Sequence, residues 1–120
     1  MENKKEGALR YDAGKAPMHL LPYDALQELA HIYGAGALKY GENNWQKGMD
    51  WSRCFNSLMR HAAAWHAGDD NDSESGQAHM LHVAWNALTI FVYASRGLGK
   101  DDRTLSAKQI TDAAMRRMGK

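Results

Sequence analysis

Two histidines and an asparagine share one face of a segment that is otherwise apolar. In residues 77–96, His79, His82 and Asn86 fall within an arc of about 60° at helical spacing, and Tyr93 extends this polar stripe. A buried polar group without a partner costs roughly 1–3 kcal/mol, so these side chains need partners from neighbouring helices or from a ligand. Isolated histidines on such faces are usually core residues bonded to the backbone, and that interpretation stays open. The alignment of three polar groups favours a functional site.

An acidic loop stands directly before this segment. Residues 69–76 read DDNDSESG and contain no apolar side chain. From this loop Asp72 and Glu74 can fold back toward His79, and imidazole with carboxylate is a ligand set for divalent metals. The spacing does not match an EF-hand. The alternative is a solvated loop in which Glu74 and Ser75 only cap the following helix.

Further candidates lie earlier in the chain. His61 and Arg60 flank the apolar stripe of residues 52–67, and the planar guanidinium of Arg60 suits a phosphate group. An ion pair between Arg60 and an acid of the following loop is equally compatible with the pattern. Trp45 precedes this segment in a loop, where its ring can stack on a base, although tryptophans are core residues by default.

Four helical segments are needed to position these residues. We expect helices at residues 22–40, 52–67, 77–96 and 106–118, because apolar side chains recur there at helical spacing. Alternating β-branched runs bounded by turns are nearly absent, which weighs against strands. The sequence therefore predicts an all-α fold, a four-helix bundle or a close relative.

The expected organisation is a single domain over residues 1–120. Residues 1–16 have no periodicity and form an N-terminal arm, and residues 104–118 contain the C-terminal helix. Residues 77–96 are apolar nearly all round, and a bundle this short has few helices to cover them. We therefore expect a homo-oligomer, either a dimer or a tetramer.

Composition excludes several classes of protein. The chain has 120 residues, 44% of them apolar, which is enough for one domain with a core. Its net charge of +1 weighs against bulk nucleic acid or an anionic membrane as a partner. Cys54 is the only cysteine, so an internal disulfide framework is excluded. With no apolar run that could span a bilayer and no N-terminal targeting pattern, we expect a soluble cytoplasmic protein.

A series of short motifs points to a known family. In chain order they are LRYDAGK at residues 9–15, PMHLLP at 17–22, ALKYG at 37–41 with Asn44 and Trp45, LMRH at 58–61, and DNDSESG at 70–76 followed by His79, His82 and Asn86. The series, which covers residues 7–97, resembles the phage-type dATP/dGTP diphosphohydrolase domain. That domain is a relative of the MazG-like all-α nucleotide pyrophosphohydrolases.

The resemblance implies a MazG-like helical fold, usually oligomeric, that uses Mg²⁺ or Mn²⁺. The implied reaction converts a purine deoxynucleoside triphosphate (dNTP) to the monophosphate and pyrophosphate. MazG-like enzymes carry metal-binding carboxylates as E-x-x-E on one helix and E-x-x-D on the next. Neither pattern occurs at residues 52–67 or 77–96, where Arg60-His61 and His79-x-x-His82 stand instead. The chain therefore departs from the pattern of the wider group at these helices, and we look for metal ligands among other residues.

On this basis we expect one or two divalent ions that bind the triphosphate and activate a water molecule. The expected metal ligands are Glu28, Asp72, Glu74, His79 and His82. His61 or Glu74 would orient the water or take its proton, and Arg60 would neutralise charge on the phosphates. The expected substrate contacts are Lys15, Lys39, Asn44, Trp45 and Asn86.

Two other functions are compatible with the same residues. The first is a zinc-dependent hydrolase of another substrate, with His61, His79 and His82 as ligands. The second is a non-enzymatic helical module that binds nucleotides or a partner and uses the histidines as a polar core network. Metal analysis distinguishes the first alternative, and the absence of dNTP turnover would favour the second.

Overall fold

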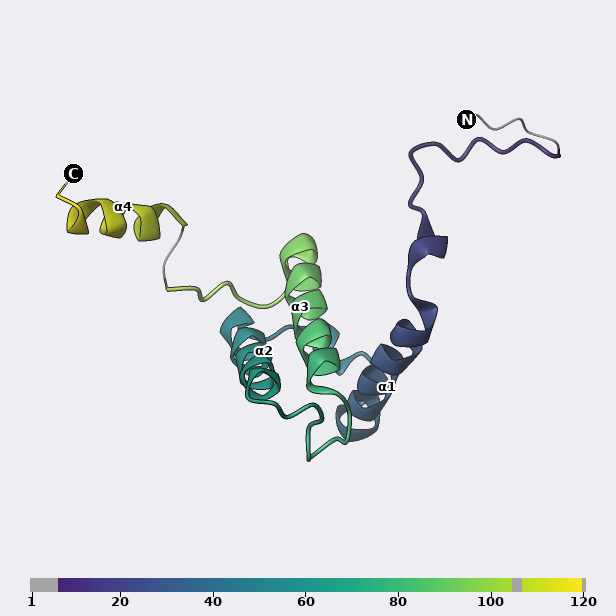
Figure 1. Ribbon diagram of the computed structural model, residues 1–120, viewed down its shortest axis with the longest axis horizontal. Coiled ribbons are helices and arrows are strands. Elements are labelled where there is room, and N and C mark those ends of the chain that lie inside the picture. The colour runs from purple at the N-terminus through teal and green to yellow at the C-terminus, as the bar shows by residue number, and fades with distance from the viewer. Residues whose placement is uncertain (1–6, 105–106, 120) are drawn as a thin grey trace.

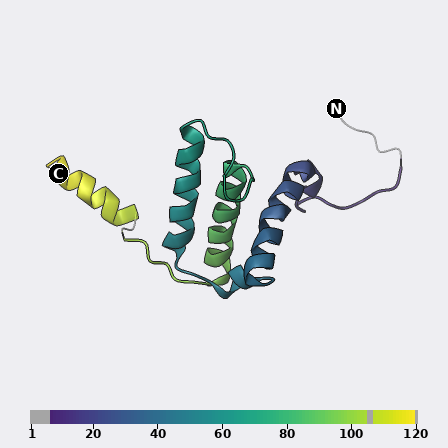
Figure 2. The same ribbon diagram turned by 90° about the horizontal axis from the view of Figure 1, so that it is seen from below.

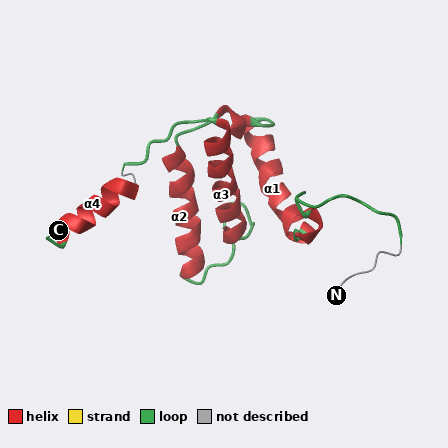
Figure 3. Ribbon diagram, turned by 90° about the horizontal axis from the view of Figure 1, so that it is seen from above, coloured by secondary structure: helices red, strands yellow, loops and turns green. Residues whose placement is uncertain are grey.

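The computed structural model describes residues 7–104 and 107–119, and this part of the chain is helical (Figure 1). Its elements are η1 (Met18–Leu20), α1 (Tyr23–Tyr40), η2 (Asn44–Lys47), α2 (Trp51–His66), α3 (His79–Arg96) and α4 (Ala107–Arg117). Figure 3 shows no strand among the described residues. The predicted all-α fold is confirmed, and each of the four expected helices begins and ends within two residues of its predicted bounds.

Three helices form the packed body of the molecule. α3 lies between α2 and α1, and α2 and α3 form an antiparallel hairpin (Figure 2). α4 lies apart from this body on one side, and the N-terminal arm extends away on the other. The radius of gyration is 20.0 Å, whereas a compact chain of this length has about 14 Å. Among the described helices, none combines the length and apolar character that crossing a membrane requires.

An aromatic cluster joins α1, η2 and α3. The fully buried Tyr93 donates a hydrogen bond from its hydroxyl to the backbone carbonyl of Trp45. The ring of Tyr33 meets that of Trp45 edge-on at a centroid distance of 5.8 Å and that of Trp85 at 5.9 Å. Burial of rings this large contributes most of the packing energy available to a small core. The cluster therefore fixes η2 and α1 against α3.

The start of α2 contacts the segment that follows α3, residues 98–102. The backbone amide of Trp51 donates to the carbonyl of Lys100 at 2.9 Å, and its indole Nε1 donates to the carbonyl of Leu98 at 3.0 Å. The Asp102 carboxylate accepts a hydrogen bond from the amide of Ser52 at 2.9 Å. Asp102 thus caps the first turn of α2 from a distant part of the sequence, which holds the α2–α3 hairpin closed at this end.

Replacing Gly99 by alanine is expected to lower the free energy of unfolding by more than about 2 kcal/mol. Gly99 has φ +70°, and a Cβ there would collide with the backbone carbonyl oxygen of Met49. Gly97 is the matched control: its φ is +68°, but nothing lies within 4 Å of a Cβ, so only the cost of the left-handed backbone, about 1–2 kcal/mol, remains. Urea unfolding measures both variants. Equal losses would contradict the close approach at Gly99.

Candidate functional site

Polar side chains of α2, α3 and the acidic loop meet at one end of the hairpin. His61 of α2 and His79, the first residue of α3, bring their Nδ1 atoms to 2.8 Å. The acidic loop joins the two helices at this end, and one donor atom each of His61, Asp72 and His79 lies within 4.8 Å of the other two. We call these three residues the donor triad. It unites two side chains predicted as metal ligands with one predicted as catalytic.

Hydrogen bonds within the acidic loop hold Asp72 in place. The Asp72 amide donates to the carbonyl of Gln77 at 2.8 Å, and the Gly76 amide donates to the carbonyl of Asp72 at 2.7 Å. The Asp72 carboxylate accepts from the backbone amide of Ser75 at 2.9 Å, and this bond lowers the pKa of Asp72 below its ordinary value of 3.8. Asp72 therefore presents an ionised carboxylate to the two histidines.

His79 is held from behind by a second carboxylate. Its side chain is buried, and its Nε2 lies 3.2 Å from an oxygen of Asp69. A nitrogen held in this way leaves Nδ1 of the same ring to face His61. Metal-binding histidines usually donate their other ring nitrogen to a carboxylate, a backbone carbonyl or a water molecule, which fixes the tautomer and the ring orientation. Sequence reasoning missed this role of Asp69, for which the position in the acidic loop was the only indication.

His82 completes the polar cluster. Its ring stacks on that of His61 with centroids 4.3 Å apart and planes inclined by 8°. Its Nε2 lies 2.7 Å from Ser75 Oγ and 3.9 Å from a carboxylate oxygen of Asp72. Burial, as the main cause, lowers the pKa of both His61 and His82 below the ordinary value of 6.5. Both rings are therefore neutral at neutral pH and can offer nitrogen lone pairs.

Acidification from pH 7.5 to pH 5.5 is expected to destabilise the fold. In the unfolded chain His61 and His82 bind protons as the pH falls through about 6.5, whereas the folded state resists this, so stability is present above that pH and is lost below it. The shift of Asp72 has the same sign but acts only near and below its ordinary pKa. Urea midpoints measure the slope. His82→Gln should flatten it, and a slope unchanged from wild type would contradict this origin; the exposed His66→Gln is the control.

Asn86 links the two helices rather than facing the donor triad. It is buried, and its amide nitrogen donates to Ser57 Oγ at 3.2 Å and to the carbonyl of His82 at 2.8 Å. The polar stripe of α3 thus finds the partners that its position required, on α2 and on the loop. The amide nitrogen of Asn86 is thus engaged within the protein, and a contact of Asn86 with substrate stays a prediction.

Three other predicted residues lie near the rim of the site. Arg60 is exposed beside His61, and its charge contributes to the lowered pKa of that ring. Glu74 is exposed in the acidic loop, and its charge acts on His82 and on Lys39 of α1. Contact with the Tyr40 hydroxyl is the main cause that raises the pKa of Lys39, and the Glu74 carboxylate adds to it. The Arg60 and Glu74 charges therefore act on histidines of the site, and the Lys39 charge acts on Glu74.

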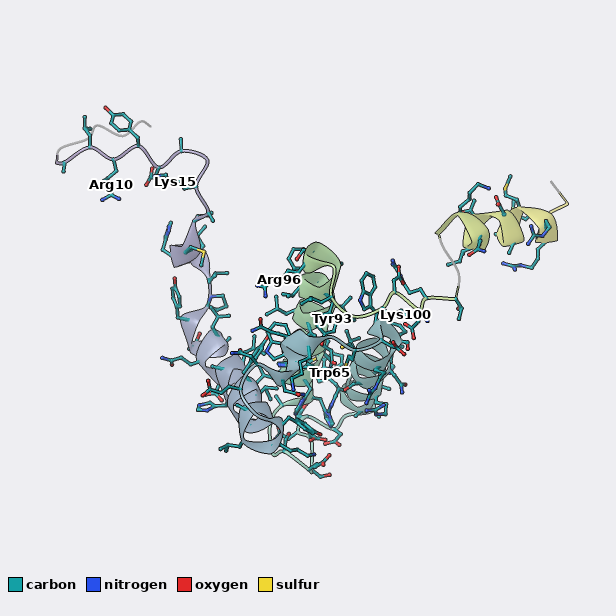
Figure 4. The ribbon with its side chains drawn as sticks, turned by 180° about the vertical axis from the view of Figure 1, so that it is seen from behind. Arg10, Lys15, Trp65, Tyr93, Arg96 and Lys100 are labelled. Atoms are coloured by element: carbon teal, nitrogen blue, oxygen red, sulfur yellow. The ribbon has the colours of Figure 1, made fainter. Side chains whose placement is uncertain are left out.

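The remaining predicted residues lie elsewhere. Figure 4 shows that the N-terminal arm carries Lys15 away from the helices. Trp45 and Asn44 lie in η2 beside Tyr93, which follows His79 by fourteen residues, about 21 Å along α3. Glu28 is exposed on α1 and is not among the donors that converge in the described part of the chain. The structure therefore does not bring these four residues to the donor triad.

The donor triad offers two imidazole nitrogens and one carboxylate oxygen. Among the described residues no other group of His, Cys, Asp and Glu brings three donor atoms this close together. Imidazole ligands suit Zn²⁺ and other late transition ions, Mn²⁺ accepts carboxylates with histidine, and Mg²⁺ prefers oxygen ligands alone. Of the two ions that the family resemblance implies, Mn²⁺ fits this donor set and Mg²⁺ does not.

Comparison with known proteins identifies the family to which the chain is similar. The family model described as "dATP/dGTP diphosphohydrolase, N-terminal" matches residues 5–103. The dATP/dGTP diphosphohydrolase of Salmonella phage PMBT28 is 33% identical over 99 residues, which cover 82% of this chain and 34% of the relative. The chain thus spans about a third of that relative's length. No solved structure matches it.

Proposed function

Because the chain belongs to the family of N-terminal dATP/dGTP diphosphohydrolase domains, we propose that it hydrolyses dATP and dGTP to the monophosphate and pyrophosphate. The observation that carries the proposal is the convergence of His61, Asp72 and His79 between α2 and α3. These residues lie within the region that the family model covers. A site with donors for a divalent ion and a cationic rim has the chemistry that a triphosphate requires.

Each residue of the site has a proposed part in the reaction. A divalent ion held by the donor triad would supply Lewis-acid stabilisation of phosphate charge. Arg60 and Lys39 would bind the phosphates and neutralise the charge that develops as pyrophosphate leaves. Glu74, an exposed carboxylate at the rim, would accept the proton of the attacking water. The hydrogen bond from Ser75 would keep Asp72 aligned with the two histidines throughout.

Nucleotide hydrolysis tests the proposal directly. The purified chain is incubated with each of the four dNTPs and with ATP and GTP, in the presence of Mg²⁺, Mn²⁺ or Zn²⁺, and products are separated by ion-exchange chromatography. We expect equal amounts of monophosphate and pyrophosphate from dATP and dGTP. Release of orthophosphate would show cleavage of a different bond, and the absence of products from every nucleotide would overturn the proposal.

We also propose that two copies of the chain pair through the outer face of α2 and α3. The chain exposes 9624 Å², whereas a compact protein of 13.4 kDa exposes about 6500 Å². The arm and α4, which extend away from the body (Figure 1), account for part of this excess, and the apolar face of α2 and α3 is the part that two copies would cover. Phe55 and Phe91 are more than half exposed on this face and line an open apolar pocket of about 660 Å³ with Ile90 and Ile110.

Replacing Phe91 by glutamate is expected to convert a dimer to a monomer, because a charge would have to be buried at the centre of the paired faces. Leu38→Glu is the matched control, since Leu38 is 93% exposed on α1 and lies outside this face. Light scattering after gel filtration measures the mass of each variant. A wild-type monomer at micromolar concentration would contradict the pairing.

A further inference from the structure

The two histidines of the donor triad, His61 and His79, direct their Nδ1 atoms toward each other. We propose that His61 Nδ1, His79 Nδ1 and a carboxylate oxygen of Asp72 form a resident site for a late first-row divalent ion, with Zn²⁺ as the preferred occupant. The inference deepens the proposed function, because the ion would occupy the same site. Zn²⁺ differs from the Mg²⁺ or Mn²⁺ that the family resemblance implies.

The spacing of the donors agrees with one shared ion. The two Nδ1 atoms are 2.8 Å apart, and all three donor atoms lie within 4.8 Å of one another. Two nitrogens bound to one tetrahedral Zn²⁺ at about 2.0–2.1 Å are about 3.3 Å apart, by the geometry of that site. The imidazoles therefore need to separate by about half an ångström, and the Asp72 oxygen, which lies within 4.8 Å of both, needs to move closer to them. Without an ion, the short contact requires one of the two Nδ1 atoms to carry a proton.

Surrounding side chains orient two of the three donors. Asp69 lies behind His79 at 3.2 Å from Nε2, so that Nδ1 is the nitrogen left for a ligand. The Ser75 amide holds Asp72 at 2.9 Å, and Ser75 Oγ in turn contacts His82. A chance cluster of surface histidines would not be expected to have hydrogen bonds that orient its side chains. Metal centres in proteins use hydrogen bonds of this kind, from groups around the ligands, to fix the orientation of the ligands.

The number and type of ligands indicate an open centre. Three protein donors leave at least one coordination position for water or a phosphate oxygen, as in catalytic zinc sites with two histidines and one carboxylate. Mg²⁺ keeps a nearly octahedral shell of oxygens and gains little from imidazole. Asp72 is the one oxygen donor of the triad, so a site of this composition discriminates against Mg²⁺.

Metal content provides a test that involves no nucleotide. The full chain is stripped with a chelator, dialysed against equal concentrations of Zn²⁺, Mn²⁺ and Mg²⁺, and analysed by elemental mass spectrometry. We expect about one Zn²⁺ per chain and no retained Mg²⁺. Loading with Co²⁺ should produce the visible absorption of a four- or five-coordinate ion. Retention of Mg²⁺ in place of Zn²⁺, or of no ion with no Co²⁺ band, would overturn the inference.

Matched variants locate the ion. His61→Asn and Asp72→Asn should each lower Zn²⁺ retention at least fivefold, whereas His66→Asn on the same helix and Asp70→Asn in the same loop should retain wild-type levels. Circular dichroism checks that each variant is folded. The folded wild type should show the Co²⁺ absorption band. Zn²⁺ retained by both His61→Asn and Asp72→Asn would contradict the assignment. A chain that holds Zn²⁺ but cleaves no dNTP would contradict only the proposed function.

Discussion

Replacing Asp72 by asparagine is expected to lower the rate of dATP and dGTP hydrolysis at least 100-fold, the scale at which loss of one charge-stabilising group acts in an active site. Asp72 is the carboxylate of the donor triad, and one of its oxygens lies 3.9 Å from Nε2 of His82. Asparagine keeps the shape and an oxygen acceptor for the Ser75 amide, so the loop should remain in place while the negative charge is lost. Steady-state kinetics with dATP measures the effect.

The matched control for this change is Asp70→Asn. Asp70 lies two residues earlier in the same loop, its side chain is exposed, and its carbonyl, which the substitution leaves intact, accepts the hydrogen bond from the His79 amide. We expect activity within about threefold of wild type, since a distant surface charge is largely screened. Equal losses in the two variants would mean that the acidic loop acts through its total charge and not through Asp72.

Replacing Tyr93 by alanine is expected to lower the free energy of unfolding by about 3–5 kcal/mol, as for other large core side chains. Tyr93 is fully buried, and its ring lies 6.3 Å from that of Trp45. The substitution removes both this packing and the hydroxyl that binds the Trp45 carbonyl. Burial raises the pKa of Tyr93 to about 12, so the hydroxyl stays protonated and continues to donate at any pH used for the measurement.

Two further variants separate the contributions of Tyr93. Tyr93→Phe keeps the ring and should cost about 0.5–1.5 kcal/mol, because the Trp45 carbonyl loses the Tyr93 hydroxyl but keeps the hydrogen bond from the Gly48 amide. Tyr40→Ala on α1 removes a ring that is 61% exposed and should cost less than about 1 kcal/mol. Chemical denaturation of the three proteins gives the ranking. A loss for Tyr93→Ala no larger than that for Tyr40→Ala would show that the aromatic cluster is not the core of the fold.

The helices could be predicted from the sequence because their periodicity is a local property. Leu29 and Tyr33 on α1, or Leu58 and Ala62 on α2, recur at helical spacing whatever the helices pack against. The placement of α4 beyond the packed body could not be predicted in this way. Ile110 and Ala114 give α4 an apolar side, but the pattern does not state which surface lies opposite it.

The candidate site was predictable only where it depends on one helix. His79 and His82 share a face by helical geometry, and their proximity to Asp72 follows from the short loop between them. The contact between His61 and His79 depends on the register of α2 against α3, which the crossing of the Trp51 and Lys100 segments helps to set. Patterns within a single helix contain no information on such a register. For the same reason the sequence places Trp45 at the site, whereas in the structure its backbone carbonyl binds Tyr93.

The donor triad and its supports all come from one continuous stretch of chain, residues 61–82. Contacts between residues so close in sequence form with a small loss of chain entropy and therefore form quickly. The hairpin that holds the donors also precedes α4 in the chain, so it is synthesised before α4 is. A centre encoded so locally can also be grafted with its hairpin onto another helical scaffold, provided that the contacts of Trp51 with Leu98 and Lys100 and of Ser52 with Asp102 are kept or replaced.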